Sequence, residues 1–537
     1  MEKVKRLFYA EGRPYFTIGG QARNSSSQSA ETMKKVWAGV EQMGLNTLAA
    51  PVYWERLEPE EGCFDFTQTD LLLEGARKHG VKLVLLWFGT WKNGASQYVP
   101  RWVKTQPERF RWAESIQHNL TRSLSPHCRA AREADRRAYC RLMEHLKAAG
   151  AEDVLLGVQV ENEPGILGTP RDYSDAGEAF FRSEVPADVM EWLRTGSSLK
   201  QIWRENGSPA GGTWEEVFGF HGEEIGTAYA MADYIDEIAA AGKAVWDIPV
   251  YVNVWLGEMY NRVPGLDYPS GGAVSRVLDL WKHVAVHIDA VCPDIYFSDY
   301  RTYFDVVGRY AREDNILYIP ESSANHMNAM NTLHAMAEYG LSGIHFFGVD
   351  DAVTNDGVLR DSYKEYRGLV SLLTAMKPMI ETWQGTDRFF VVTQYEGSAS
   401  QYLDFGDFCG RAVHYLPDGD CRWEPHRGTD TYHREDSGTF QKLAKGIIVY
   451  LGDGEFYLAG EGFSLNLLRR ASVREMTGGV LASQFQNGRH QRYLQIEEGH
   501  FDYNGDYIVD RVRTGDECDT GVWMDADVGV VHLKIQM

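Results

Sequence analysis

Two carboxylates in this sequence stand directly after short apolar runs. Glu163 follows the run in GVQVENEPG (157–165), and Glu321 follows ILYIP (316–320). In a parallel barrel the carboxyl ends of all strands meet at one mouth, so these two side chains would face each other across it. Such a pair across an apolar cleft can split a glycosidic bond, with one carboxyl as general acid and the other as nucleophile or general base. The sequence therefore predicts a catalytic pair that needs no metal ion.

The two residues before Glu163 have different expected roles. Glu161 shares the parity of Glu163 along the strand, so both side chains are expected on the same side. Because Glu161 lies deeper in the strand, we expect it in a hydrogen-bonded interior network rather than in the reaction. Asn162 either caps a turn or contacts a ligand.

Eight short apolar runs between residue 14 and about residue 380 alternate with helical patterns such as residues 129–150. The runs are PYFTIGGQ (14–21), LNTLAAPVYW (45–54), VKLVLLWFG (81–89), VLLGVQVEN (154–162), IPVYVNVWL (248–256), DAVCPDIY (289–296), ILYIPESS (316–323) and SGIHFFGVDD (342–351). This alternation predicts a (β/α)8 TIM barrel. The G-x-G-x-x-G fingerprint of an open doubly wound sheet is absent after the first strand.

The chain divides into two predicted domains. Residues 1–384 form the catalytic barrel, with a long insertion after the fourth strand (about 166–246) that is expected to build the active-site rim. Residues 385–537 change to short alternating runs separated by Gly, Asp and Asn turns. They predict a C-terminal all-β, sandwich-like accessory domain.

Composition limits the classes of partner. A formal net charge of −22 argues against nucleic acid and anionic membranes, which both need a basic surface. Fifteen Trp and twenty-eight Tyr offer flat faces for the apolar sides of sugars, so a carbohydrate substrate is expected. The N-terminus lacks the apolar run of a secretory signal, and no stretch of the chain is apolar over the length of a membrane span. The seven scattered cysteines predict reduced thiols and a cytoplasmic location. No cofactor is expected, and a homo-oligomer is compatible with the sequence.

Several segments resemble glycoside hydrolase family 35, the retaining β-galactosidases, and in particular a bacterial branch with a C-terminal β-sandwich. They include NTLAAPVYWERLEPEEGCFDF (46–66), LLWFGTWKNGASQYVPRWVK (85–104) and VQVENEPG (158–165). The resemblance implies Glu163 as acid/base and Glu321 as nucleophile, with carboxyl groups about 5–5.5 Å apart. It also implies that Asn162 bonds the sugar 2-hydroxyl.

Further polar and aromatic residues at strand ends are candidates for substrate binding. They are Gln21, Asn24, Tyr53, Trp87, Lys92, Asn93, Trp255, Tyr296, Phe347 and Asp350. The segment GGQARNSS (19–26) departs from the Gly-Gly-Glu-Leu-His-Asn-Ser-Ser pattern of the branch, with Gln21 and Arg23 in place of Glu and His. An amide and a guanidinium differ from these groups in what they donate and accept, so the identity of the sugar stays open.

The sequence thus predicts a retaining, exo-acting β-glycosidase, with β-galactosidase as the first choice, that hydrolyses terminal β-linked sugars from oligosaccharides by double displacement. Exo action is inferred from the family resemblance alone. The alternatives are a transglycosylase or a β-glucosidase-type activity on the same scaffold. A non-catalytic carbohydrate-binding protein is a further alternative, and retention of both Glu163 and Glu321 argues against it.

Overall fold

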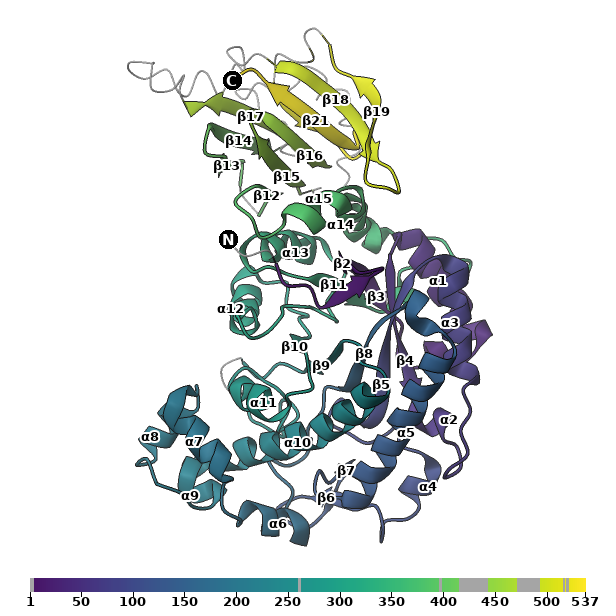
Figure 1. The fold of residues 1–537 in the computed structure, drawn as a ribbon, viewed down its shortest axis with the longest axis vertical. Coiled ribbons are helices and arrows are strands. Elements are labelled where there is room, and N and C mark those ends of the chain that lie inside the picture. The colour runs from purple at the N-terminus through teal and green to yellow at the C-terminus, as the bar shows by residue number, and fades with distance from the viewer. Residues whose placement is uncertain are drawn as a thin grey trace.

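A computed structural model of the chain shows a parallel seven-stranded sheet curled into a barrel, with helices around its outer face (Figure 1). It describes residues 4–258, 262–395, 398–414, 443–470, 493–514, 517 and 521–537. In sheet order the barrel strands are β10 (Ala290–Pro293), β9 (Val250–Val254), β8 (Leu155–Asn162), β5 (Lys82–Lys92), β4 (Thr47–Tyr53), β3 (Thr17–Gln21) and β11 (Gly343–Phe347). Each lies within or overlaps one of the predicted runs.

The seventh predicted run closes the barrel as an irregular segment between β10 and β11. The Ile319 amide donates to the Gly343 carbonyl at 3.3 Å, and the Ile295 amide donates to the Glu321 carbonyl at 2.9 Å. Pro320 interrupts the ladder because it has no amide hydrogen. The predicted (β/α)8 barrel is confirmed, with eight strand positions of which one is irregular.

Helices of the barrel follow its strands in the expected alternation. They are α1 (Ala30–Met43), α2 (Trp54–Leu57), α3 (Thr67–His79), α4 (Arg101–Lys104), α5 (Arg129–Ala148), α11 (Leu278–Val284), α12 (Tyr300–Tyr310), α13 (His326–Glu338), α14 (Lys364–Ala375) and α15 (Lys377–Trp383). Helix α5 buries its Ala131, Ala138 and Leu142 face, and the chain leaves it through Gly150, whose φ of 61° suits glycine. Two hairpins flank the barrel, β1 (Phe8–Ala10) with β2 (Arg13–Tyr15) and β6 (Trp112–Glu114) with β7 (Leu120–Leu124).

The insertion after β8 carries five helices. They are α6 (Asp175–Phe181), α7 (Ala187–Gly196), α8 (Lys200–Glu205), α9 (Trp214–Phe218) and α10 (Gly222–Val245). Figure 1 shows α7, α8 and α9 gathered at the edge of the molecule, away from the barrel strands. Leu167 and Gly168, at the start of the insertion, line a cavity next to the mouth. Helix α10 packs on α5 and α11 of the barrel as well as on α9. The expectation that the insertion builds the active-site rim stays a prediction.

The C-terminal part is all-β, as predicted. One sheet has the order β12 (Phe389–Thr393), β15 (Lys445–Gly452), β16 (Glu455–Glu461), β21 (Val530–Ile535), β18 (Tyr493–Phe501), β19 (Tyr507–Val512), and the other has the order β13 (Ser400–Asp404), β14 (Phe408–His414), β17 (Phe463–Arg469), β20 (Val522–Met524). Apolar residues of both sheets, such as Leu458 and Leu465, share one core, which is the packing of a sandwich. Val391 and Ile447 join the core of the barrel instead. The boundary at residue 384 stays a prediction.

Three sequence-based expectations concern groups outside the mouth. Cys63, Cys128, Cys140, Cys292 and Cys409 are free thiols, whereas Cys421 and Cys518 lie outside the described residues. Among the described residues, no group of three or more His, Cys, Asp or Glu is arranged to hold a metal ion. No helix in the described part of the chain is both long enough and apolar enough to cross a bilayer.

Candidate active site

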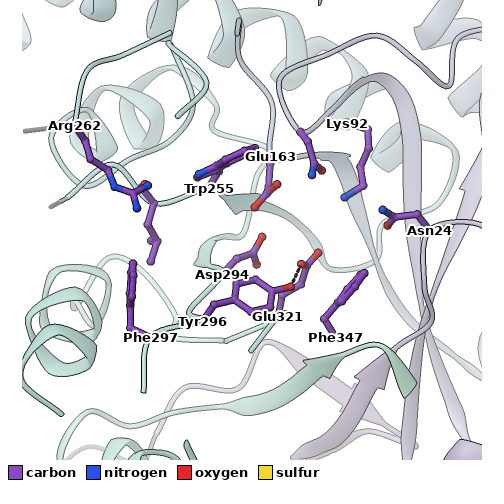
Figure 2. Close-up of a pocket in the computed structure, with 12 residues that line it drawn as sticks. Asn24, Lys92, Glu163, Trp255, Arg262, Asp294, Tyr296, Phe297, Glu321 and Phe347 are labelled. Carbon is purple, nitrogen blue, oxygen red and sulfur yellow. Dashed lines mark hydrogen bonds between the residues drawn. The ribbon is translucent and has the colours of Figure 1, made fainter. Parts of the chain in front are cut away.

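A cavity of about 500 Å³ lies at the mouth of the barrel, where both predicted carboxylates meet (Figure 2). Glu163 follows β8, and Glu321 belongs to the irregular seventh segment. The other lining residues are Asn24, Lys92, Asn93, Trp255, Leu256, Arg262, Asp294, Tyr296, Phe297 and Phe347. A cleft with apolar walls and a few convergent polar groups has the character of a small-molecule site.

Glu321 is held by three donors and is only 4% exposed. The Gln21 amide donates to its Oε1 at 2.9 Å, and the Asn162 amide donates to the same oxygen at 3.4 Å. The Tyr296 hydroxyl donates to Oε2 at 2.6 Å. Three donors fix the carboxylate in one orientation, which a nucleophile needs in order to meet an anomeric carbon.

Asn162 is oriented in turn by Lys92, whose Nζ donates to Asn162 Oδ1 at 2.7 Å. The pairing of β5 with β8 shifts register between Trp87 and Lys92, and this irregularity brings Lys92 opposite Asn162. The Lys92 ammonium also lies 5.1 Å from the centroid of the Phe88 ring. With its carbonyl oxygen occupied by Lys92, Asn162 can only present its amide N–H groups toward Glu321.

Glu163 is set in an unusual backbone conformation, with φ of 44°. Its amide donates to Asn253 Oδ1 at 2.8 Å, and Asn253 donates to Asp294 Oδ2 at 2.7 Å. Burial, together with the negative charge of Glu321, raises the pKa of Glu163 to about 7, while Lys92 acts in the opposite direction. A carboxyl group with this pKa can give up and take back a proton near neutral pH.

Asp294, directly after β10, lines the cavity, whereas its place on the sixth predicted strand favoured a structural role. Burial together with the charges of Glu321 and Glu163 raises its pKa well above its usual range. Figure 2 shows its carboxyl group beside those of Glu163 and Glu321. Its position at a strand end was a sequence signal, because catalytic groups of barrels come from such ends.

Glu161 does not share the side of Glu163, so the parity prediction is wrong. Glu161 has φ of 62°, and the two positive φ values break the period of two along the strand. Its carboxyl group accepts the amides of Thr90 at 3.0 Å and Trp91 at 2.5 Å. Burial and the neighbouring Asp135 of α5 raise the pKa of Glu161 well above its usual range. Glu161 thus lies in an interior network.

Several predicted binding residues are brought to the cavity, and others are not. Asn24, Lys92, Asn93, Trp255, Tyr296 and Phe347 line it, and Gln21 and Asn162 reach it through Glu321. Tyr53 is buried and bonds Ser27, and Trp87 is buried and bonds Asp135. Asp350 accepts from the Arg23 amide and the Ser26 hydroxyl, so it holds the loop after β3 rather than facing the cavity. Their predicted sugar contacts are not supported by these positions.

The departures in GGQARNSS have separate consequences. Gln21 bonds Glu321, whereas the Arg23 side chain pairs with Asp351 at 2.6 Å and stays 57% exposed. Within the described residues, Gln21 Oε1, Asn24 Oδ1 and Asp294 Oδ1 are buried oxygens without a hydrogen-bond partner. Buried acceptors at a cavity are costly unless something donates to them, which a bound polyol would do.

Arg262, Leu256 and Phe297 are further lining residues that sequence reasoning missed. They lie in loops beyond β9 and β10, so no strand end marks them. The Arg262 guanidinium donates to the Leu256 carbonyl at 3.1 Å. Arg262 and Phe297 lie across the cavity from Asn24 and Lys92 (Figure 2).

Comparisons with known proteins point to one enzyme class. The family model that matches residues 24–206 is that of glycoside hydrolase family 42, described as beta-galactosidase. A second model, described as a domain of unknown function (DUF5597), matches residues 367–525. No curated protein matches the sequence. The first match supports a glycoside hydrolase.

Solved structures of similar shape share little sequence with this chain. The catalytic domain of a beta-amylase from Paenibacillus polymyxa is 13% identical, with a TM-score of 0.49 over 66% of this chain and 97% of that one. A beta-galactosidase from Bacillus circulans sp. alkalophilus is 17% identical, with a TM-score of 0.48 over 70% of this chain and 58% of that one. One from Rahnella sp. R3 is 16% identical, with a TM-score of 0.49 over 71% and 58%. The match thus spans under three fifths of these galactosidases.

The resemblance to family 35 is overturned by these findings. The model that matches residues 24–206, which include Glu163, is that of family 42. Carboxylates at strand ends are a feature of the barrel and its chemistry, so segments that carry them separate related families poorly. Residues 24–206 of this chain are similar to the family 42 β-galactosidases.

Proposed function

We propose that this protein is a retaining β-glycosidase that acts on β-galactosides. The observation that carries the proposal is a pair of carboxyl groups at the mouth of the barrel, one suited to donate a proton and the other oriented to act as a nucleophile. Glu163 has a pKa raised to about 7 and can donate a proton. Glu321 is oriented by Gln21, Asn162 and Tyr296.

The first half of the reaction forms a covalent intermediate. A Glu321 oxygen attacks the anomeric carbon while the bond from that carbon to the glycosidic oxygen breaks, and Glu163 gives its proton to this oxygen. The leaving group departs as an alcohol, and the sugar remains as an ester of Glu321. The Asn162 amide would meet the 2-hydroxyl, where a hydrogen bond gains strength as positive charge develops on the ring.

The second half returns the enzyme to its starting state. Esterification removes the negative charge of Glu321, which is one of the causes of the raised pKa of Glu163. Glu163 can then take a proton from water as the water oxygen bonds to the anomeric carbon and the ester bond breaks. Two displacements at one carbon retain the β configuration.

The test is a screen of 4-nitrophenyl β-galactoside, β-glucoside, β-fucoside and α-arabinoside. NMR identifies which anomer of the free sugar is released first. We expect the highest kcat/KM for the β-galactoside and release of the β-anomer. Preferred cleavage of the β-glucoside would contradict the proposed specificity for β-galactosides. Initial release of the α-anomer would contradict the retaining mechanism.

A further inference from the structure

A second cavity, of about 420 Å³, adjoins the candidate active site and shares three of its lining residues, Asn24, Lys92 and Asn93. Its other walls are Ala95, Gln97, Tyr98, Thr121, Arg122, Leu167 and Gly168. Beyond it, a hollow of about 560 Å³ shares Gln97, Thr121 and Arg122 and adds Lys104 and Trp112 among its lining residues. The shared lining residues indicate that the three hollows follow one another away from Glu163 and Glu321, and we call this row of hollows the groove.

The direction of this groove follows from the roles of the active-site groups. The 2-hydroxyl is carried by C2, the ring carbon next to the anomeric carbon, so with Asn162 at this hydroxyl the sugar ring extends from the anomeric carbon toward the side of Asn162 and Lys92. The leaving group must lie under Glu163 on the other side. Figure 2 shows Trp255, Arg262 and Phe297 on that side and Asn24 and Lys92 opposite. The second cavity therefore continues beyond the non-reducing end of the transferred sugar.

Hydrogen bonds hold the walls of the groove in place. The Ser96 amide donates to the Arg122 carbonyl at 2.8 Å, and the Ser123 hydroxyl donates to the Gly94 carbonyl. The Leu167 amide reaches the same Gly94 carbonyl at 3.2 Å. The loop after β5, strand β7 and the start of the insertion are thus fastened to one another around the cavity.

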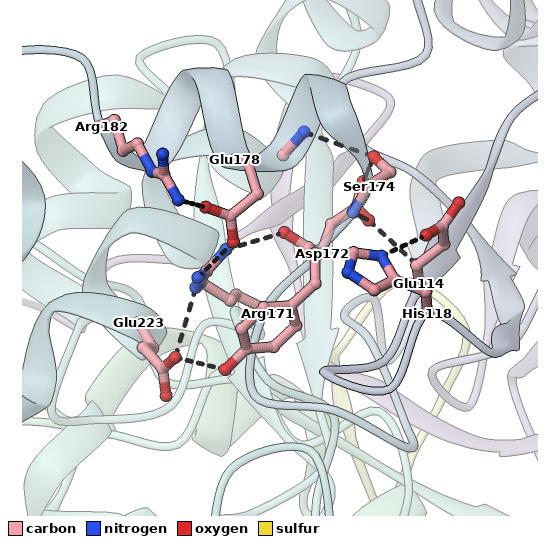
Figure 3. A network of polar contacts seen from close by, with 10 residues as sticks. Glu114, His118, Arg171, Asp172, Ser174, Glu178, Arg182 and Glu223 are labelled. Atoms are coloured by element: carbon pink, nitrogen blue, oxygen red, sulfur yellow. Dashed lines mark hydrogen bonds and ion pairs between the residues drawn. The ribbon is translucent and has the colours of Figure 1, made fainter.

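The network in Figure 3 anchors the hairpin that carries Arg122. Asp172 accepts the Glu114 amide of β6 at 2.9 Å. It also accepts the Ser125 hydroxyl, just beyond β7, at 2.6 Å. The adjacent Arg171 pairs with Glu178 at 2.6 Å and with Glu223 at 3.2 Å. This network ties the hairpin to α6 and α10, so the groove is preformed.

The charges along the groove differ from those of the whole protein. The chain has a formal net charge of −22, yet no carboxylate is among the residues that line the second cavity or the hollow beyond it, and both contain Arg122. In the part of the chain that the structure describes, no carboxylate pairs with the exposed Arg122 guanidinium, whereas Lys104 pairs with Glu55 at 3.2 Å. A free guanidinium fork in a groove lined by amides and aromatic rings fits a carboxylate on a sugar.

We propose that the second cavity binds a further sugar unit on the non-reducing side of the cleaved bond, with Arg122 pairing with the carboxylate of an acidic sugar. The inference rests on the proposed glycosidase function and goes beyond terminal cleavage. Exo action had its only support in the resemblance to family 35. A groove that continues past the transferred sugar admits a chain, so the enzyme would cut internal bonds of an acidic oligosaccharide.

The test compares three 4-nitrophenyl β-glycosides: that of galactose, that of a β-linked galactobiose, and that of the same disaccharide with a galacturonate as its outer unit. We expect the two disaccharides to be released intact. The acidic one should have a kcat/KM about tenfold above that of the neutral one, the size of one charge-assisted contact. This advantage should shrink as salt is added, because the pair is exposed.

Arg122→Gln should abolish the advantage of the acidic disaccharide. Arg111→Gln is the matched control, because Arg111 is exposed, precedes the same hairpin, pairs only with Glu108 at 3.6 Å among the described residues and lines neither hollow. Release of galactose before nitrophenol from galactobioside would overturn the second subsite. Equal kcat/KM for the acidic and neutral disaccharides, or an advantage that survives in Arg122→Gln, would overturn the pairing.

A failure of the proposed function has a different signature, which is that wild-type protein cleaves none of the three substrates. Titration calorimetry of the free acidic disaccharide into the wild type and Arg122→Gln then decides the inference by binding alone. Saturable binding that weakens about tenfold in the variant supports the subsite. Absence of binding to the wild type overturns it.

Discussion

Glu161 and Glu163 are two residues apart, and both have raised pKa values, but they belong to different regions of the molecule. Glu161 is fully buried against Asp135 and two backbone amides, so its carboxyl group is closed to any ligand. Glu163 faces a cavity and Glu321. A raised pKa therefore marks function only where a substrate can reach the group.

The two regions depend on each other through the backbone. Glu161 holds the amides of Thr90 and Trp91, the residues that precede Lys92 on β5. Lys92 in turn orients Asn162 and faces Glu163. The buried network of Glu161 thus helps to position the residues of the cavity. Four variants should distinguish residues that position the site from residues that take part in the reaction.

The largest effect is expected for Glu321→Gln. Loss of the covalent nucleophile should lower kcat by about 10⁴-fold or more, because an amide cannot form the glycosyl ester. A 2-fluoro galactosyl fluoride should label the wild type at residue 321, seen by mass spectrometry of peptides, and leave the variant unlabelled. Labelling of another carboxylate, such as Asp294, would reassign the nucleophile.

Glu163→Gln should have the next largest effect, and its size should depend on the leaving group. For an alkyl galactoside, kcat/KM should fall about 10²–10⁴-fold, the usual contribution of a positioned general acid. For a dinitrophenyl galactoside, whose leaving group needs no proton, kcat/KM should change little. Equal losses on both substrates would show that Glu163 is not the proton donor.

Glu161→Gln should act on stability and leave the proton donor in place. One of the two amides of β5 loses its acceptor, so the free energy of unfolding should fall by about 1–3 kcal/mol. Urea denaturation measures this loss, and the exposed carboxylate of Glu152, changed to Gln, is the matched control with little expected change. A dependence on leaving group like that of Glu163→Gln would place Glu161 in the reaction.

The smallest effect concerns pH. Since Glu163 must be protonated to act, kcat/KM of the wild type should fall as pH rises through about 7. Lys92 lowers the pKa of Glu163, so Lys92→Met should move this fall to higher pH. The pH profile separates this shift from the lower kcat/KM that a displaced Asn162 would cause. An unchanged or lower midpoint would contradict the electrostatic role of Lys92.

Much of the barrel could be read from the sequence because its strands are short apolar runs with polar ends. The same rule brought Glu163, Glu321, Lys92 and Tyr296 to one mouth, since strand ends of a closed barrel converge. It failed for Trp87, which lies inside the long strand β5 and points toward α5. Arg262 and Phe297 follow strands at a distance, and only the path of their loops brings them to the cavity.

The sequence by itself determined the type of barrel and the two carboxylates, because apolar periodicity and strand ends are local properties. It also determined the formal net charge of −22. Only the tertiary structure decided that Glu161 turns away from Glu163, because positive φ angles are imposed by the surrounding contacts. The tertiary structure alone showed Asp294 beside Glu163 and Glu321, and it alone showed the groove toward Arg122. The site and the groove each bring together residues that are distant in the chain.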